Sequence, residues 1–264
     1  MPERDASEDT RLLVAYLREA GAIARHYFGG TFKVTNKSNN SPVTDADLAI
    51  DKFLHEKLLA QRPDYGWLSE ESTDDPARLN CARTFVVDPI DGTHGFIKRR
   101  PQFTIVAAVV VEGRPQSAAI YNPITEEMFE ATLACGARKN GQPIHVSFTT
   151  DLADSRLFFA RDVFDSPRWA TPWPESVTVE TRSSIAYRMG LVAAGEFDAM
   201  VSPTRKSDWD LAAGDLLVHE AGGTVTDSDG TLLIYNRPAP DQETVICATP
   251  ALHGLLLARL KERT

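Results

Sequence analysis

Apolar residues recur at helical intervals in two segments near the start of the chain. The first segment has Ser7 as a candidate N-cap and ends at Gly29-Gly30, and the second begins at Thr44. In each segment the apolar side chains fall on one face of a helix, which predicts two amphipathic helices. These residues are Leu12, Leu13, Tyr16, Ala20, Ile23 and Tyr27 in the first segment and Ile50, Phe53, Leu54 and Leu58 in the second.

Further along, short apolar runs separated by turn residues predict strands. Helices then return, and this alternation of helices with groups of strands predicts a layered α/β fold with halves at residues 1–150 and 151–264. The strands are expected at about 84–88, 103–111, 117–121, 128–131 and 155–160, the helices at about 184–194, 209–221 and from Thr249 onward, and an ordered loop at 161–177.

Composition narrows the classes of protein that fit this pattern. The chain has 264 residues, of which 42% are hydrophobic, so it can bury a large core. Its net charge of −9 argues against a general nucleic-acid or membrane-surface binder. The N-terminus lacks an apolar signal core, no apolar run is long enough to span a bilayer, and the three cysteines are far apart. We therefore expect a cytoplasmic protein with reduced, buried thiols.

The most informative run is Asp88-Pro89-Ile90-Asp91-Gly92-Thr93, which directly follows the strand predicted at 84–88. Carboxylates at a strand end collect hard cations, and backbone N–H groups with a hydroxyl bind phosphate. Because Asp, Pro and Gly all favour turns, the run is also a good turn sequence. If the run forms a binding site, its carboxylates, backbone N–H groups and hydroxyl predict metal-assisted phosphate chemistry.

This run, followed by Phe96, resembles the signature of the inositol monophosphatase family of Mg²⁺-dependent, lithium-sensitive phosphatases. The resemblance implies an α/β (α+β) fold, namely a five-layered αβαβα sandwich with its site between the two halves, and a homodimer. Three further segments are similar to motifs of that family and occur in the family's order. They are Val43-Thr44-Asp45-Ala46-Asp47, Leu68-Ser69-Glu70-Glu71-Ser72, and Trp209-Asp210 with Ala212, Ala213 and Gly214.

The resemblance also implies a site for two or three Mg²⁺ ions. One ion would bind Glu70, Asp88 and the carbonyl of Ile90, and a second would bind Asp88, Asp91 and Asp210. A weaker third ion would lie near Glu70. Without cations, several carboxylates in one cleft would repel one another, and some would take up protons.

In the reaction that the resemblance implies, water activated by the metal attacks phosphorus without a covalent phosphoenzyme. Thr93 would orient this water, with a hydrogen bond toward Asp47, and Glu70 would help to activate it. The substrate would contact Gly92, Thr93, Ser183, Ser184, Lys206 and Asp210.

Structural roles compete with several of these assignments. Asp47 fits a helix capping box, and Asp210 lies where a helix dipole favours acids. Glu70 also fits a solvated acidic loop. The role of His94 beside the motif is left open. So is that of Lys98-Arg99-Arg100, which fits either contact with a second phosphate or a solvated surface.

Two small phosphate esters are the leading substrates. Gly95, where inositol phosphatases usually have Asn, resembles the 3′(2′),5′-bisphosphate nucleotidase branch, whereas Tyr121-Asn122-Pro123 resembles generic inositol monophosphatase sequence. We therefore expect a phosphomonoesterase for inositol monophosphate or 3′-phosphoadenosine 5′-phosphate. Histidinol phosphate and sugar bisphosphates are alternatives. A non-catalytic role beside RNA polymerase, as in some bacterial relatives, is the rival from another class, against which the full set of candidate ligands argues.

Overall fold

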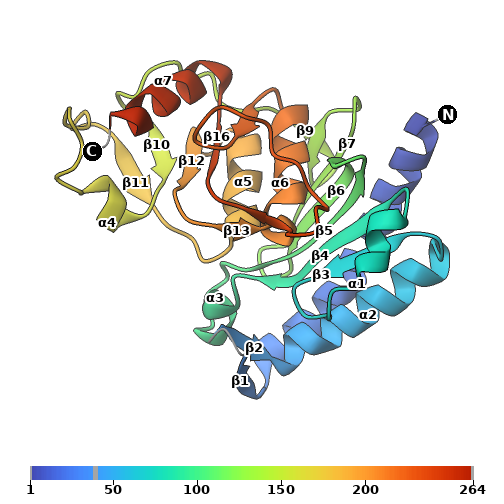
Figure 1. Ribbon diagram of the computed structural model, residues 1–264. Coiled ribbons are helices and arrows are strands. Elements are labelled where there is room, and N and C mark those ends of the chain that lie inside the picture. The colour runs from blue at the N-terminus through green and yellow to red at the C-terminus, as the bar shows by residue number, and fades with distance from the viewer. Residues whose placement is uncertain (1, 38–40, 263–264) are drawn as a thin grey trace.

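The computed structural model describes residues 2–37 and 41–262 and arranges them in five layers (Figure 1). Two N-terminal helices form the first layer, and a seven-stranded sheet forms the second. A central pair of helices separates this sheet from a five-stranded sheet, whose far face is covered by the last helix. The αβαβα sandwich predicted from the sequence is therefore confirmed.

The first layer consists of α1 (Pro2–Gly29) and α2 (Asp45–Gln61), which pack on one face of the seven-stranded sheet. Their apolar faces and the sheet enclose one apolar core. Thr44 caps α2 as predicted. The prediction that Ser7 caps the first helix is wrong, because α1 begins at Pro2 and includes Ser7.

The seven-stranded sheet has the order β3-β4-β5-β6-β7-β8-β9. Strands β3 and β4 are parallel, and all other neighbours are antiparallel. The predicted strand at 84–88 is present and continues through the central motif to Asp91. The seven strands are β3 (Gly66–Ser69), β4 (Thr84–Asp91), β5 (Thr104–Val111), β6 (Arg114–Asn122), β7 (Glu127–Thr132), β8 (Ala137–Lys139) and β9 (Gln142–Ile144).

The central layer consists of α5 (Ile185–Ala193) and α6 (Asp208–Glu220), and α7 (Pro250–Lys261) forms the last layer. The largest apolar core lies around α5 and α6 and takes residues from both predicted halves, so the division at 150/151 stays a prediction. The five-stranded sheet, in spatial order, contains β11 (Thr178–Glu180), β10 (Arg156–Phe158), β12 (Ala199–Ser202), β16 (Val245–Ala248) and β14 (Thr224–Thr226).

Short elements connect these layers, and one of them, α4, lies at the start of the segment predicted to be a loop at 161–177. Cys247 is buried, but Cys135 is exposed, so the expectation of buried thiols is wrong there. Within the described residues, no helix combines the length and apolarity needed to cross a membrane. The short elements are β1 (Val34–Asn36), β2 (Pro42–Thr44), the 3₁₀ helix Pro76–Asn80, α3 (Thr93–Ile97), α4 (Arg161–Phe164), β13 (Lys206–Ser207) and β15 (Asp241–Gln242).

Candidate functional site

A bulge at the end of β4 explains the spacing of the two motif carboxylates. Asp88 pairs with Val106 of β5 and Asp91 pairs with Thr104, so three steps along β4 match two steps along β5. Side chains three positions apart point to opposite faces of a regular strand, and one extra residue returns them to the same face. A bulge also tolerates Pro89, which has no N–H to donate.

Asp210 completes a cluster with Asp88 and Asp91, although 119 residues separate Asp91 from it. One carboxylate oxygen from each of the three lies within 4.8 Å of the others. Asp210 is in the first turn of α6, where its Oδ2 accepts the N–H of Ser207 at 2.9 Å in a capping box. The structure thus brings together three predicted metal ligands, and their role as ligands stays a prediction.

The N-terminus of α5 holds Asp91 in place. Oδ2 of Asp91 accepts hydrogen bonds from Ser184 Oγ and the N–H of Ala186, both at 2.6 Å, and Oδ1 of Asp91 accepts the N–H of Ile185 at 3.2 Å. Such first-turn N–H groups have no acceptor inside their own helix. Ser184 is buried and engaged with Asp91, so we infer that it positions this carboxylate.

Burial is the main cause that raises the pKa of all three clustered carboxyl groups. It raises the pKa of Asp91 to about 6 and that of Asp210 to about 8. The pKa of Asp88 lies well above its usual range, because burial is reinforced by the negative charges of Glu70 and of its cluster partners. Such a group of oxygen donors at neutral pH fits a hard divalent cation such as Mg²⁺.

Gly92 leaves the strand in a left-handed conformation, with φ of 94°, and is followed at once by α3. A Cβ at this position would lie 2.8 Å from the backbone nitrogen of Ser184, so both conformation and space favour glycine. The tight turn places Thr93 at the start of α3, where the first backbone N–H groups lack helical acceptors.

Thr93 and Asp47 form the hydrogen-bonded pair expected from the sequence. The Thr93 hydroxyl lies 3.3 Å from Asp47 Oδ1 and 3.1 Å from the carbonyl oxygen of Ile90, either of which can accept its hydrogen. Asp47 Oδ2 accepts the backbone N–H of Thr44 at 2.9 Å, so the capping box and the contact with Thr93 coexist. Burial raises the pKa of Asp47 to about 6.

Glu70 lies outside the three-carboxylate cluster and pairs with a lysine that no motif marked. Lys37 Nζ is 2.9 Å from Glu70 Oε1 and 2.8 Å from Glu71 Oε1. The side chain of Glu71 is only 3% exposed, which contradicts the alternative of a fully solvated acidic loop. Sequence reasoning missed Lys37 because its partners lie 33 and 34 residues away, on another element.

The remaining candidate residues separate into two groups. Ser183 and Lys206 line a pocket of about 280 Å³ between α4 and α5. His94 and the run Lys98–Arg100 are exposed. Within that run, Arg99 donates hydrogen bonds to carbonyl groups at the end of α1, among them that of Tyr27 at 2.9 Å.

Several known proteins of different named functions are similar to this chain. The Nus factor SuhB of Escherichia coli K12 is 32% identical over 83% of this chain and 85% of its own. The CysQ 3′(2′),5′-bisphosphate nucleotidase of Haemophilus influenzae is 32% identical over 89% of this chain and 88% of its own, and the histidinol-phosphatase of Chlorobaculum parvum is 30% identical over 96% of each.

A solved structure and a family model extend the match to nearly the whole chain. The structure of a Thermotoga maritima IMPase superposes with a TM-score of 0.84 and 25% identity over 97% of each chain. The model of the inositol monophosphatase family matches residues 5–264. The chain therefore belongs to the inositol monophosphatase family of phosphatases.

Proposed function

We propose that this protein is a Mg²⁺-dependent phosphomonoesterase that hydrolyses a small phosphate ester. The observation that carries the proposal is the buried cluster of Asp88, Asp91 and Asp210 beside the Thr93–Asp47 pair. Asp88, Asp91 and Asp210, together with Glu70 and the carbonyl of Ile90, would hold two or three Mg²⁺ ions. Bound Mg²⁺ neutralises phosphate oxygens and makes a coordinated water more acidic.

The residues around the cluster supply positioning and a route for the proton. When the Thr93 hydroxyl donates to Asp47 Oδ1, its oxygen lone pairs are free to accept a hydrogen from the attacking water. Asp47, with a pKa of about 6, is mostly ionised at pH 7 and can accept a proton through Thr93. The backbone N–H groups of Gly92 and Thr93 would bind phosphate oxygens, and Ser183 would contact the rest of the substrate.

Inositol monophosphate and 3′-phosphoadenosine 5′-phosphate are the two leading substrates. The family name supports the first, and the CysQ relatives support the second. The histidinol-phosphatase relative keeps histidinol phosphate as an alternative. From the family alone we also propose a cytoplasmic homodimer that lithium inhibits.

Phosphate release from a panel of esters tests the proposal. Inositol 1-phosphate, 3′-phosphoadenosine 5′-phosphate, fructose 1,6-bisphosphate and histidinol phosphate would each be incubated with the protein, with Mg²⁺ and with a chelator. We expect Mg²⁺-dependent release from at least one ester. Because SuhB relatives are named as a Nus factor, the absence of release from all four would favour a non-catalytic role.

Substitution of Thr93 tests its place in the reaction. Thr93→Val keeps the shape of the side chain and removes the hydroxyl, so we expect kcat to fall about 10- to 100-fold, the range of one lost catalytic hydrogen bond. The Mg²⁺ concentration for half-maximal activity should stay within about threefold. Thr93→Ser retains the hydroxyl and should recover most of the activity. Equal losses in the two variants would remove the hydroxyl from the mechanism.

A further inference from the structure

The 280 Å³ pocket lies next to the carboxylate cluster and contains two cationic side chains. Arg188 is on α5, four residues after Ser184, and Lys206 is on β13, four residues before Asp210. The negative charge of Asp91 acts on both cations, which places them within electrostatic reach of the cluster. Arg188 is therefore on the helix whose N-terminus holds Asp91, and Lys206 is on the strand directly before the helix that carries Asp210.

Neither cation is neutralised by an ion pair with the described residues. Arg188 donates from Nε and Nη2 to the carbonyl oxygen of Arg182, at 2.7 Å from Nε. Lys206 Nζ donates to Thr204 Oγ1 at 2.9 Å and to the carbonyl oxygen of Arg205 at 3.1 Å. All of these acceptors are neutral. One carboxylate, that of the exposed Asp162, also lines the pocket and pairs with neither cation.

Partial burial makes this arrangement costly without an anion. Burial is the main cause that lowers the pKa of Arg188 and of Lys206, and the charge of Arg188 lowers that of Lys206 further. The negative charges of Asp91 and Asp210 offset these effects only in part. Two charges of the same sign that are both half-buried are stabilised when an anion binds between them. In a chain with a net charge of −9, an unneutralised cationic pocket is a local exception.

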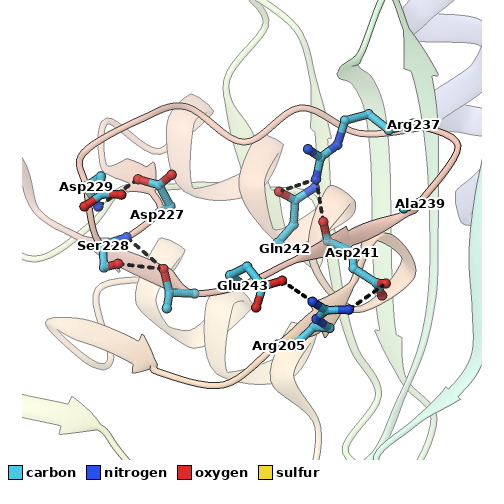
Figure 2. Close-up of a pocket in the computed structure, with 10 residues that line it drawn as sticks. Arg205, Asp227, Ser228, Asp229, Arg237, Ala239, Asp241, Gln242 and Glu243 are labelled. Atoms are coloured by element: carbon cyan, nitrogen blue, oxygen red, sulfur yellow. Dashed lines mark hydrogen bonds and ion pairs between the residues drawn. The ribbon is translucent and has the colours of Figure 1, made fainter.

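A second pocket shows the contrast. This pocket has a volume of about 410 Å³. In it, Arg205 pairs with Glu243 and Asp241, and Arg237 donates hydrogen bonds to oxygens of Gln242 and Asp241 (Figure 2). Four carboxylates and two guanidinium groups line it, so its charge does not favour an anion. It also contains none of the clustered carboxylates.

We propose that Arg188 and Lys206 form a subsite for a second anionic group of the substrate, so that the preferred substrates are small bisphosphates. This inference rests on the proposed phosphatase function and adds the substrate class. One phosphate would lie at the carboxylate cluster and be hydrolysed, and the other would lie between the two cations. Inositol monophosphate has no second anion, and the cationic ammonium group of histidinol phosphate would be repelled.

Paired substrates test the subsite. For 3′-phosphoadenosine 5′-phosphate, Arg188→Gln and Lys206→Gln should each lower kcat/KM at least about tenfold, the effect of losing one charge-assisted hydrogen bond. For adenosine 3′-phosphate, which lacks the second phosphate, the change should stay below about threefold. Fructose 1,6-bisphosphate against fructose 1-phosphate forms a second arm, which separates nucleotide from sugar substrates. Lys52→Gln and Arg138→Gln, at exposed sites outside the pocket, are matched charge controls and should affect neither pair.

A binding measurement separates failure of the subsite from failure of the enzyme. Adenosine 5′-phosphate and fructose 6-phosphate carry only the second phosphate, and calorimetry should show that the wild-type protein binds one of them. We expect both variants to weaken that binding at least about tenfold. Equal losses for bisphosphates and monophosphates, or binding that the variants leave unchanged, would overturn the subsite even if phosphate release occurs. Absence of release with intact, variant-sensitive binding would overturn only the phosphatase proposal.

Discussion

Asp88→Asn is expected to lower kcat by at least about 10³-fold and, at the same time, to stabilise the metal-free protein. Asp88 would help to hold two of the proposed Mg²⁺ ions, so its substitution would weaken the binding of both. A loss of 10³-fold corresponds to about 4 kcal/mol of transition-state stabilisation. We choose Asp88 because Asp91 also holds the N-terminus of α5, and its substitution would mix catalytic and structural effects.

The expected gain in stability follows from the raised pKa of Asp88. Above about pH 4, the folded state binds more protons at this group than the unfolded state, so the metal-free protein loses stability as pH rises. The substitution Asp88→Asn removes this loss of stability, because an amide does not titrate. The melting temperature of the metal-free variant should therefore exceed that of the wild type by roughly 2–4 °C at pH 8, about 1 kcal/mol for a chain of this size, and by less at pH 5.

Thermal melts with and without Mg²⁺ provide the control. Mg²⁺ should raise the melting temperature of the wild type at pH 8 and raise that of Asp88→Asn much less, because binding to the folded state alone stabilises it. Asp229→Asn removes an exposed carboxylate and should change neither activity nor stability. Wild-type kcat in Asp88→Asn would refute the metal assignment, and a lower melting temperature would refute the argument from repulsion.

Much of the fold followed from local patterns in the sequence. The amphipathic spacing in α1 and α2 and the turn residues around β5 to β7 depend on neighbours in the chain, so they can be read directly. The start of α1 could not be read directly from the sequence, because Pro2 also fits the first turn of a helix and Ser7 is tolerated inside one. The Asp88–Asp91 spacing was recognised as a site, but its cause, the bulge, depends on pairing with β5.

The parts of the candidate site that the sequence did not reveal are contacts between distant elements. Ser184 holds Asp91 across 93 residues, and Lys37 reaches Glu70 across 33. Arg188 shows no motif at all, because its helical face is decided by how α5 packs between the two sheets. Motifs therefore identified the groups that carry charge, whereas the residues that position those groups required the tertiary structure.

Asp215 is another buried acid, on α6, and its substitution should have the largest effect on stability. Its side chain is fully buried and accepts hydrogen bonds from Arg114 at 2.9 and 3.2 Å and from the Tyr235 hydroxyl at 2.8 Å. His219 Nδ1 lies 2.7 Å from it, and this contact raises the pKa of the histidine. These bonds join α6, which carries Asp210, to β6 and to the segment near Tyr235.

Asp215→Asn is expected to lower the free energy of unfolding by about 3 kcal/mol, since it leaves a partly buried cation without its partner. The value is at the lower end of the range for buried pairs because the Arg114 side chain is 36% exposed and stays partly hydrated. For a chain of this size, the melting temperature should fall by roughly 6–12 °C. Glu243→Gln breaks the exposed pair with Arg205 and should lower the melting temperature much less, because solvent screens an exposed pair. Similar shifts in the two variants would show that burial of the pair does not decide its contribution, and that α6 is held in place by apolar packing alone.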